Sequence, residues 1–127
     1  MNLAQLQAKA VPGVGARLKR PRVHRAQRAQ CGLLEELARA RGHIVGKRYE
    51  QKAISLDKCT QIINGLSSSL DFDNGGEVVV NLARLYDYCV ARLYTAGIKL
   101  DPTLIDEVTT LMTTIKRGWV GVQANNA

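Results

Sequence analysis

Few residues of this chain have the types and the spacing that chemistry requires. Its two histidines, His24 and His43, stand apart from any cysteine or carboxylate at the spacing of metal ligands. No nucleophile is paired with a general base in a recognisable motif. We therefore predict that the protein is not an enzyme and holds neither a metal ion nor a cofactor.

Oxygen-bearing side chains gather in one short stretch ahead of a long apolar pattern. Asp71, Asp73, Asn74 and Glu77 could offer ligands to calcium, but their spacing is not that of an EF-hand loop. Helix capping explains these groups better. The Gly75-Gly76 pair lacks the preceding strand and the lysine of a phosphate-binding loop. We predict a turn that starts the next helix.

The three cysteines, Cys31, Cys59 and Cys89, form no Cys-x-x-Cys pair, and an odd number suits no disulfide framework. Free thiols indicate a reducing compartment such as the bacterial cytosol. The N-terminus has no apolar signal segment, and the longest aliphatic run of the body, Val78 to Val80, is far too short to cross a bilayer. We expect a cytoplasmic protein with no membrane insertion.

The net charge of +7 is concentrated in one segment. Residues 1–30 contain seven Lys or Arg and no Asp or Glu, whereas the remaining 97 residues carry 11 basic and 11 acidic residues. Such a segment could bind phosphates by releasing counterions. It has no aromatic side chain on which a base could stack. Nucleic-acid binding through this tail therefore stays an alternative, and not the favoured one.

From Gly32 onwards, apolar residues recur at helical spacing. The pattern predicts four helices, over approximately residues 32–46, 48–68, 76–96 and 102–122. Short loops and the absence of a strand pattern favour an all-α, antiparallel up-down bundle. The predicted organisation is a basic, disordered tail (1–31), a helical bundle (32–122) and a frayed C-terminus (123–127). A first helix that begins at Gly32 would be too short to cover its neighbours.

The helix boundaries have recognisable signals. Gly46 is predicted to end the first helix, and Gly97 to end the third, because glycine favours the position that follows a helix. The fourth helix has the clearest start: Asp101 can cap it, and Pro102 suits the first helical position.

The third helix has apolar residues over more than one narrow stripe. We assign Leu82, Leu85, Cys89 and Leu93 to the core. A second set, at steps of four beside that stripe, could edge a groove for a partner's amphipathic helix, although core packing is the simpler explanation of its pattern. The candidate partner-binding residues of this groove are Tyr86, Val90 and Tyr94. If the groove lies elsewhere, we expect it against the fourth helix, around Leu104 and Met112.

Several motifs resemble one family. They are Leu70-Asp71-Phe72-Asp73-Asn74-Gly75-Gly76-Glu77, then Asn81-Leu82-Ala83-Arg84-Leu85-Tyr86-Asp87-Tyr88, then Arg92-Leu93, Asp101-Pro102, Ile105, Glu107-Val108 and Trp119. In an all-helical chain of this size, this combination closely resembles the flagellar export chaperone family FliS. The match runs from about Gly32 to Trp119, roughly 70% of the chain.

The resemblance implies a cytoplasmic helical bundle that binds the C-terminal region of flagellin. It implies that the chaperone prevents premature polymerisation, supports flagellin secretion and filament assembly, and meets other flagellar export components. It implies no cofactor and no catalysis. The alternative is a helical adaptor that binds another amphipathic helix.

Residues 1–31 depart from the family pattern, because they lack the tyrosines and the apolar helix start that family members carry there. We hypothesise that this segment comes from a shifted reading frame or a misassigned start. The expected physical consequence is lost cover for the bundle.

Overall fold

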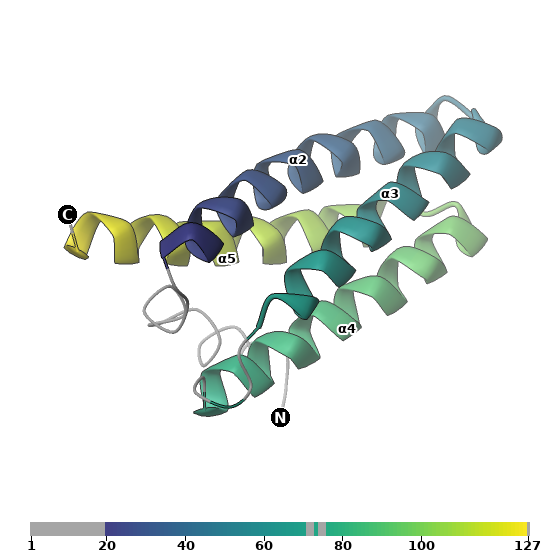
Figure 1. Ribbon diagram of the computed structural model, residues 1–127. Helices are drawn as coiled ribbons and strands as arrows, with labels where there is room; N and C mark the ends of the chain where they lie inside the picture. The colour runs from purple at the N-terminus through teal and green to yellow at the C-terminus, as the bar shows by residue number, and fades with distance from the viewer. Residues whose placement is uncertain (1–19, 71–72, 74–75, 127) are drawn as a thin grey trace.

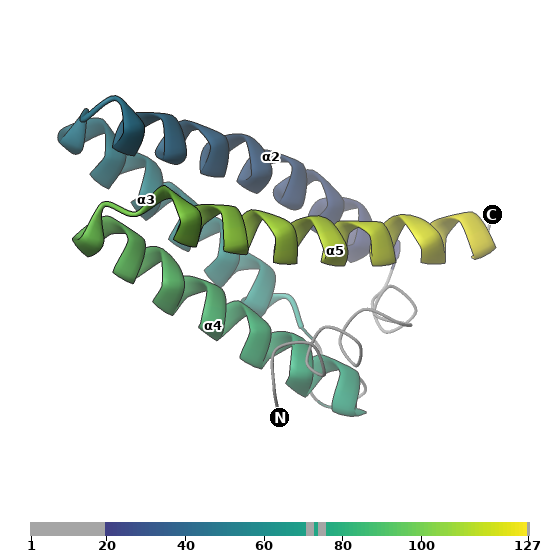
Figure 2. The ribbon, with the colours of Figure 1, turned by 180° about the vertical axis from the view of Figure 1, so that it is seen from behind.

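The computed structural model describes residues 20–70, 73 and 76–126. These residues form four helices, α2 (Arg20–Val45), α3 (Tyr49–Ser68), α4 (Gly76–Lys99) and α5 (Pro102–Asn126). Figures 1 and 2 show them running alternately up and down the long axis of the molecule. Each packs on its two neighbours in the order α2, α3, α4, α5, and α5 closes the ring against α2. The predicted all-α antiparallel bundle is confirmed.

The first helix is longer than the sequence pattern predicts. α2 begins at Arg20, twelve residues before Gly32, so part of the predicted tail is helical. Ala26 and Gln30 are buried there. The predicted truncation is therefore wrong, because small and polar residues can occupy core positions that a search for large apolar residues overlooks. The rest of that tail, residues 1–19, lies outside the described residues.

α2 ends at Val45, directly before Gly46, as predicted, whereas α4 ends later than its glycine signal suggests. α4 continues through Gly97 to Lys99, and Leu100 takes the left-handed conformation at φ 55. The amide of Asp101 then donates to the carbonyl of Ala96 at 3.3 Å, which closes the helix end. At the C-terminus, α5 continues to Asn126, so residues 123–126 are helical rather than frayed.

Gly97 serves close packing and not helix termination. A methyl group at this position would lie 3.0 Å from Cδ1 of Leu56 on α3. The Lys52 ammonium of α3 donates to the Gly97 carbonyl at 3.0 Å. The missing side chain thus lets α3 and α4 approach each other near this end of the bundle.

The predicted start of α5 is confirmed. Asp101 Oδ1 accepts hydrogen bonds from the Thr103 amide at 2.9 Å and from its hydroxyl at 2.6 Å, while Pro102 is the first helical residue. These hydrogen bonds lower the pKa of Asp101. The sequence signal and the structure agree because capping depends only on residues close together in the chain.

The core is almost entirely aliphatic, and all four helices contribute to it. The residues assigned to the core of α4 from the sequence are fully buried or nearly so. The largest buried side chains are Tyr86, Leu33, Leu37, Ile63, Leu82, Leu85, Leu93, Ile105, Leu111, Met112 and Ile115.

Two polar clusters fix α5 to its neighbours. On the α4 side, the Tyr88 hydroxyl donates to Oε1 of Glu107, and Arg92 donates to Oε2 from Nε at 3.1 Å and Nη2 at 2.9 Å. On the α2 side, Arg41 reaches both carboxylate oxygens of Asp106, at 2.7 and 3.3 Å. These contacts set the register of α5 against both flanking helices.

Candidate partner-binding surfaces

The structure separates the candidate partner-binding residues. Tyr86 has 1% of its surface exposed and Met112 has none, so both belong to the core. Val90 is half-buried and packs against the core, whereas Tyr94 is 73% exposed. The predicted placement of Tyr86 and Met112 on a surface groove is wrong for this conformation of the chain.

The reason is the pitch of the helix. Each residue turns by about 100°, so each step of four advances by 400° and drifts by about 40°. From Tyr86 through Val90 to Tyr94, the side chains therefore rotate from the core towards solvent. Residues at steps of four lie on one face only over a short length.

Leu104 lies at a different seam. It is half-buried at the start of α5 and packs against the core. Contacts from Tyr88 and Arg92 to Glu107 identify the α4 flank that meets α5. Gly97, two turns beyond Val90, meets α3 on the other flank. Val90 and Leu104 therefore do not form two walls of one groove.

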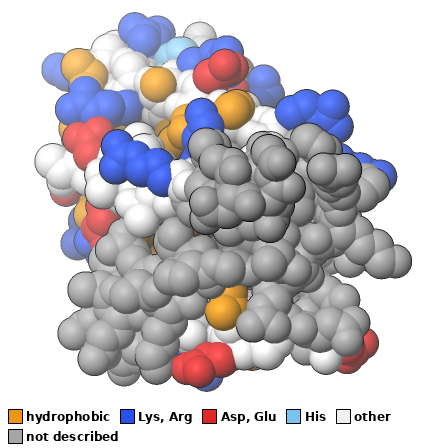
Figure 3. Space-filling model, turned by 90° about the vertical axis from the view of Figure 1, so that its left-hand side faces the viewer, with side chains coloured by type: hydrophobic (Ala, Val, Ile, Leu, Met, Phe, Trp, Pro, Cys, Tyr) orange, Lys and Arg blue, Asp and Glu red, His pale blue; other side chains and the backbone are white. Residues whose placement is uncertain are grey.

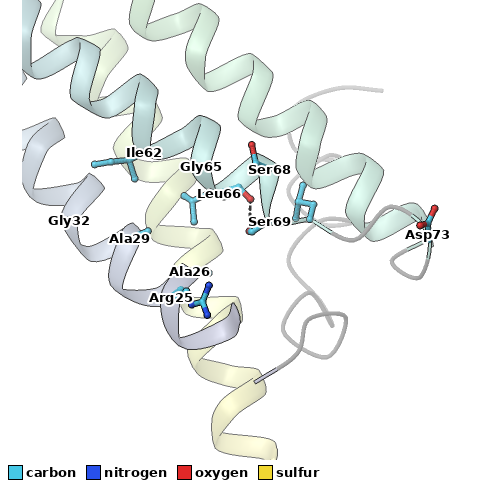
Figure 4. Close-up of a pocket in the computed structure, with 11 residues that line it drawn as sticks. Arg25, Ala26, Ala29, Gly32, Ile62, Gly65, Leu66, Ser68, Ser69 and Asp73 are labelled. Atoms are coloured by element: carbon cyan, nitrogen blue, oxygen red, sulfur yellow. Dashed lines mark hydrogen bonds between the residues drawn. The ribbon is translucent and has the colours of Figure 1, made fainter. Parts of the chain in front are cut away.

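A groove that the sequence did not reveal opens between α2 and α3. It has a volume of about 880 Å³. Figure 4 shows its two sides, with α2 and α3 contributing small and aliphatic residues that face the same space. The lining residues are Arg25, Ala26, Ala29, Gly32, Ile62, Gly65, Leu66, Ser68, Ser69, Leu70 and Asp73.

Two glycines leave this groove open. At both Gly32 and Gly65, a methyl group would find no heavy atom within 4 Å. The helix backbones are therefore accessible from the groove, and the space can hold side chains of another segment. The sequence prediction missed this groove because it placed the start of the helix at Gly32. Ala26, Ala29 and Gly32 form one stripe of small residues only in a helix that starts before Ala26.

The rim of the groove is polar and is partly engaged within the chain. The Ser69 hydroxyl donates to the Leu66 carbonyl at 2.7 Å, as the dashed line in Figure 4 shows. Arg25 lies at the α2 edge and Asp73 beyond the end of α3. An apolar floor with charges of both signs at its edges suits an amphipathic partner.

Buried polar side chains lie near the groove end of the core. Neither amide atom of Gln30 has a hydrogen-bond partner among the described residues, and Nδ2 of Asn81 has none either. The Tyr86 hydroxyl lies beside Gln30. Burial raises the pKa of Tyr86, and the Gln30 side chain opposes that rise only in part. Among the described residues, the buried polar groups at this end of the core therefore have fewer hydrogen-bond partners than those elsewhere.

The arrangement offers binding surfaces rather than reactive groups. Burial raises the pKa of both Cys59 and Cys89 to about 12, so these thiols stay protonated at neutral pH. His43 accepts a hydrogen bond at Nδ1 from Nε of Arg48 at 3.0 Å. Within the part of the chain that the structure describes, no three His, Cys, Asp or Glu residues are grouped as metal ligands.

The described residues do not support the alternatives of a calcium-binding loop or a basic nucleic-acid surface. Of the predicted turn, Asp71, Phe72, Asn74 and Gly75 lie outside the described residues, and Gly76 begins α4 with φ +61. In Figure 3, basic and acidic side chains are interspersed over the described part of the face, without a continuous basic stripe. None of the described helices is both long enough and apolar enough to span a membrane.

Comparison with known proteins connects these features to one family. The family model for flagellar protein FliS matches residues 29–126. The flagellar secretion chaperone FliSB of Pseudomonas aeruginosa is 44% identical over 91 residues, which are 72% of each chain. The chaperone FliS of Salmonella typhimurium is 38% identical over 69% of this chain and 66% of its own length. FliS of Vibrio cholerae is 30% identical over 90% of this chain and 85% of its own. The chain belongs to the FliS family of flagellar secretion chaperones.

Proposed function

We propose that this chaperone binds the C-terminal region of flagellin in the bacterial cytoplasm, prevents its premature polymerisation and supports its secretion and filament assembly. Chaperones of this family are not enzymes, in agreement with the sequence analysis. Membership of the family supports a flagellar substrate, and the surfaces of the bundle support the manner of binding.

The observation that carries the proposal is the open groove between α2 and α3. A groove that has an aliphatic floor, and space beside Gly32 and Gly65, suits the apolar face of an amphipathic helix. Exposed contiguous apolar surface of this kind usually marks a partner site.

A second contact surface lies on α4 and at the start of α5. We propose that flagellin also covers Val90, Tyr94 and Leu104. Because these residues lie on separate seams, one rigid helix could not cover all of them together with the groove. A segment that folds on binding can follow several seams, since a flexible chain wraps a large surface at modest affinity per unit area.

Filling the groove tests this proposal without weakening the bundle. Gly65→Leu places a side chain where a methyl group would meet nothing within 4 Å, and it replaces a poor helix former within α3. We expect the variant to be as stable as the parent or more so, and to bind a flagellin C-terminal peptide at least tenfold more weakly in isothermal titration calorimetry.

Gly65→Ala is the matched control, because it gains helix propensity but fills little of the groove. It should stabilise the bundle by about 0.5–1 kcal/mol and change peptide affinity by less than about threefold. Unchanged affinity of Gly65→Leu would show that the peptide does not use this groove. No binding by the parent chain would reject flagellin as the partner.

The contribution of α4 is tested at its most exposed aromatic residue. Tyr94→Ser removes a ring that is 73% exposed, so helix content should not change. Loss of the contact should reduce flagellin affinity by roughly 1–3 kcal/mol, the scale of a buried aromatic anchor. A titration that matches the parent chain would remove Tyr94 from the site.

A further inference from the structure

One end of the bundle exposes large apolar side chains that no neighbouring helix covers. The two short turns, between α2 and α3 and between α4 and α5, both lie there (Figures 1 and 2). Seven large hydrophobic residues are exposed in the described part of the chain, and four of them lie at or beside these turns. They are Val45, which is 61% exposed, Tyr49, 49%, Ile98, 66%, and Leu100, 38%. We call residues 45–49 and 98–100 the turn end.

Each turn holds a side chain where glycine is the usual residue. Lys47 has φ 58 and Leu100 has φ 55, and they are the non-glycine residues with positive φ among those described. The left-handed conformation is unfavourable for a residue with a Cβ atom, and strain of this kind concentrates at functional sites. The two turns thus keep one cationic and one aliphatic side chain, although glycine would relieve the strain.

The turn end is also basic. Residues 41–52 and 97–106 contain five Lys or Arg and three Asp or Glu, of which Glu50 is exposed. Arg48 donates to a histidine nitrogen and to a backbone carbonyl, both at 3.0 Å, and Lys52 donates to a backbone carbonyl at 3.0 Å. Because these acceptors carry no charge, both cations keep their positive charge uncompensated.

Other charges at this end follow the same pattern. Lys47 and Lys99 are exposed and belong to none of the salt bridges among the described residues. By contrast, Asp106 is paired with Arg41 at 2.7 Å, and Asp101 caps α5 through Thr103. The turn end therefore presents a surplus of free cations around exposed apolar side chains.

We propose that the turn end is a peripheral membrane contact, which binds the surface of an anionic phospholipid bilayer. The aliphatic side chains of both turns enter the boundary between headgroups and acyl chains, and Tyr49 lies at the level of the headgroups. The lysines extend their ammonium groups to the lipid phosphates. The chain lies on the bilayer and does not cross it, and none of the described helices could do so.

An anionic bilayer suits this surface better than a nucleic acid or a folded acidic protein. Phosphate contacts in a nucleic acid use cations, but they give the exposed aliphatic side chains no role. A folded protein must match the shape of two protruding turns, whereas lipids rearrange around them. The combination of aliphatic, aromatic and cationic side chains is that of an interfacial contact.

The turn end lies far from the α2–α3 groove. On α2, the groove residues Arg25 to Gly32 precede Val45 by at least thirteen helical steps, about 20 Å. One molecule could therefore hold a partner in the groove while its turn end rests on a bilayer.

The contact should be weak and sensitive to salt. Each Lys or Arg beside an anionic leaflet strengthens binding about fivefold. Four such cations strengthen it on the order of a few hundredfold over a neutral bilayer. The attraction falls off within a Debye length, so added salt should weaken binding.

A fluorescent probe at one position tests the proposal on the full chain. In a Cys31→Ser background, Ile98→Cys can be labelled with an environment-sensitive dye, because Cys59 and Cys89 are buried. Vesicles of phosphatidylcholine with about 30% phosphatidylglycerol should shift the emission to the blue, and vesicles of phosphatidylcholine alone should not. A dye on the native, exposed Cys31 is the control. It lies about 21 Å along α2 from Val45 and should not respond.

Stable variants give an independent test by vesicle sedimentation. Leu100→Gly relieves backbone strain, so it should fold at least as well as the parent. It should nevertheless bind anionic vesicles roughly threefold to tenfold more weakly, because an apolar side chain no longer enters the interface. A purely structural role of Leu100 would cause no such loss.

Paired substitutions test the charge. Lys47→Gln with Lys99→Gln should weaken vesicle binding about 25-fold. Lys58→Gln with Arg84→Gln, at exposed positions of α3 and α4, is the charge-matched control and should weaken binding less than about threefold.

The outcomes separate the alternatives. Equal losses from both pairs would show that the bilayer attracts net charge without using the turn end, and would overturn the proposal. A response of the dye at Cys31 that equals the response at residue 98 would assign the contact to the basic segment before α2. Duplex DNA that shifts the dye at residue 98, where anionic vesicles do not, would reassign the surface to nucleic acid. Since no flagellin is present, the result does not depend on the proposed chaperone function.

Discussion

Gln30 offers a direct test of how the groove end of the core is packed. Its side chain is completely buried on α2, yet neither its amide nitrogen nor its amide oxygen has a partner among the described residues. A buried polar group without a partner costs free energy, because it has lost its hydrogen bonds to water. Gln30→Met keeps the length of the side chain and removes both polar atoms. It should therefore stabilise the bundle.

The expected magnitude follows from the two unsatisfied atoms. Leaving a buried donor or acceptor unpaired costs about 1–3 kcal/mol. The Tyr86 hydroxyl lies beside this amide and would lose a polar neighbour, which offsets part of the gain. We expect a net stabilisation of about 1–2 kcal/mol. Gln and Met have similar helix propensities, so the backbone contributes little to the difference.

The assay is urea unfolding followed by circular dichroism. The midpoint should rise with an unchanged slope, because the surface exposed on unfolding stays the same. Gln51→Met, at an exposed position of α3, is the control and should change the stability by less than about 0.5 kcal/mol. The double variant Gln30→Met with Tyr86→Phe should be more stable than Gln30→Met alone. A destabilised Gln30→Met would refute the reasoning and indicate that ordered water satisfies the amide in solution.

Three further predictions follow from the fold. Leu100→Gly should stabilise the protein in thermal unfolding by about 1 kcal/mol, because Leu100 holds a left-handed conformation that glycine adopts without strain. A lower melting temperature would show that the packing of the Leu100 side chain outweighs this backbone strain. Partial burial raises the pKa of Glu107, but hydrogen bonds from its two donors on α4 outweigh burial, so the net pKa is lowered. The stabilisation from this lowered pKa is present above about pH 4.5 and is lost as pH falls through the folded value, so Glu107→Gln should make stability less sensitive to acid below pH 5. A thiol reagent should label Cys31 rapidly and label Cys59 and Cys89 only as the bundle opens, since the latter two are buried; three equal labelling rates would contradict their burial.

The sequence determined the features that depend on local chemistry. The start of α5 could be read from Asp101 and Pro102, because a cap is formed by neighbours in the chain. The core stripe of α4 could be read from the spacing of Leu82, Leu85 and Cys89, because large apolar residues at helical spacing have few other uses. Most of the family motifs lie in these same two helices, whereas residues 70–75 of the first motif precede α4.

Features that depend on contacts between helices could not be read in this way. The start of α2 was missed because its buried residues include Ala26 and Gln30, and neither residue type by itself indicates a core position. Gly97 was read as a helix end, although the nearby Leu56 of α3 explains it as a point of close packing. The α2–α3 groove was missed for the same reason, since it exists only where two helices leave space between them.

The candidate binding residues show where the two kinds of information meet. The sequence determined that α4 has more apolar residues than one buried stripe needs, and Tyr86 and Tyr94 are equivalent in that pattern. Only the tertiary structure decided that Tyr86 is 1% exposed and Tyr94 73% exposed. The physical reason is that a drift of about 40° at each step of four turns the second tyrosine past the edge of the neighbouring helix. The position of that edge depends on how α3 and α4 pack, and no local pattern encodes it.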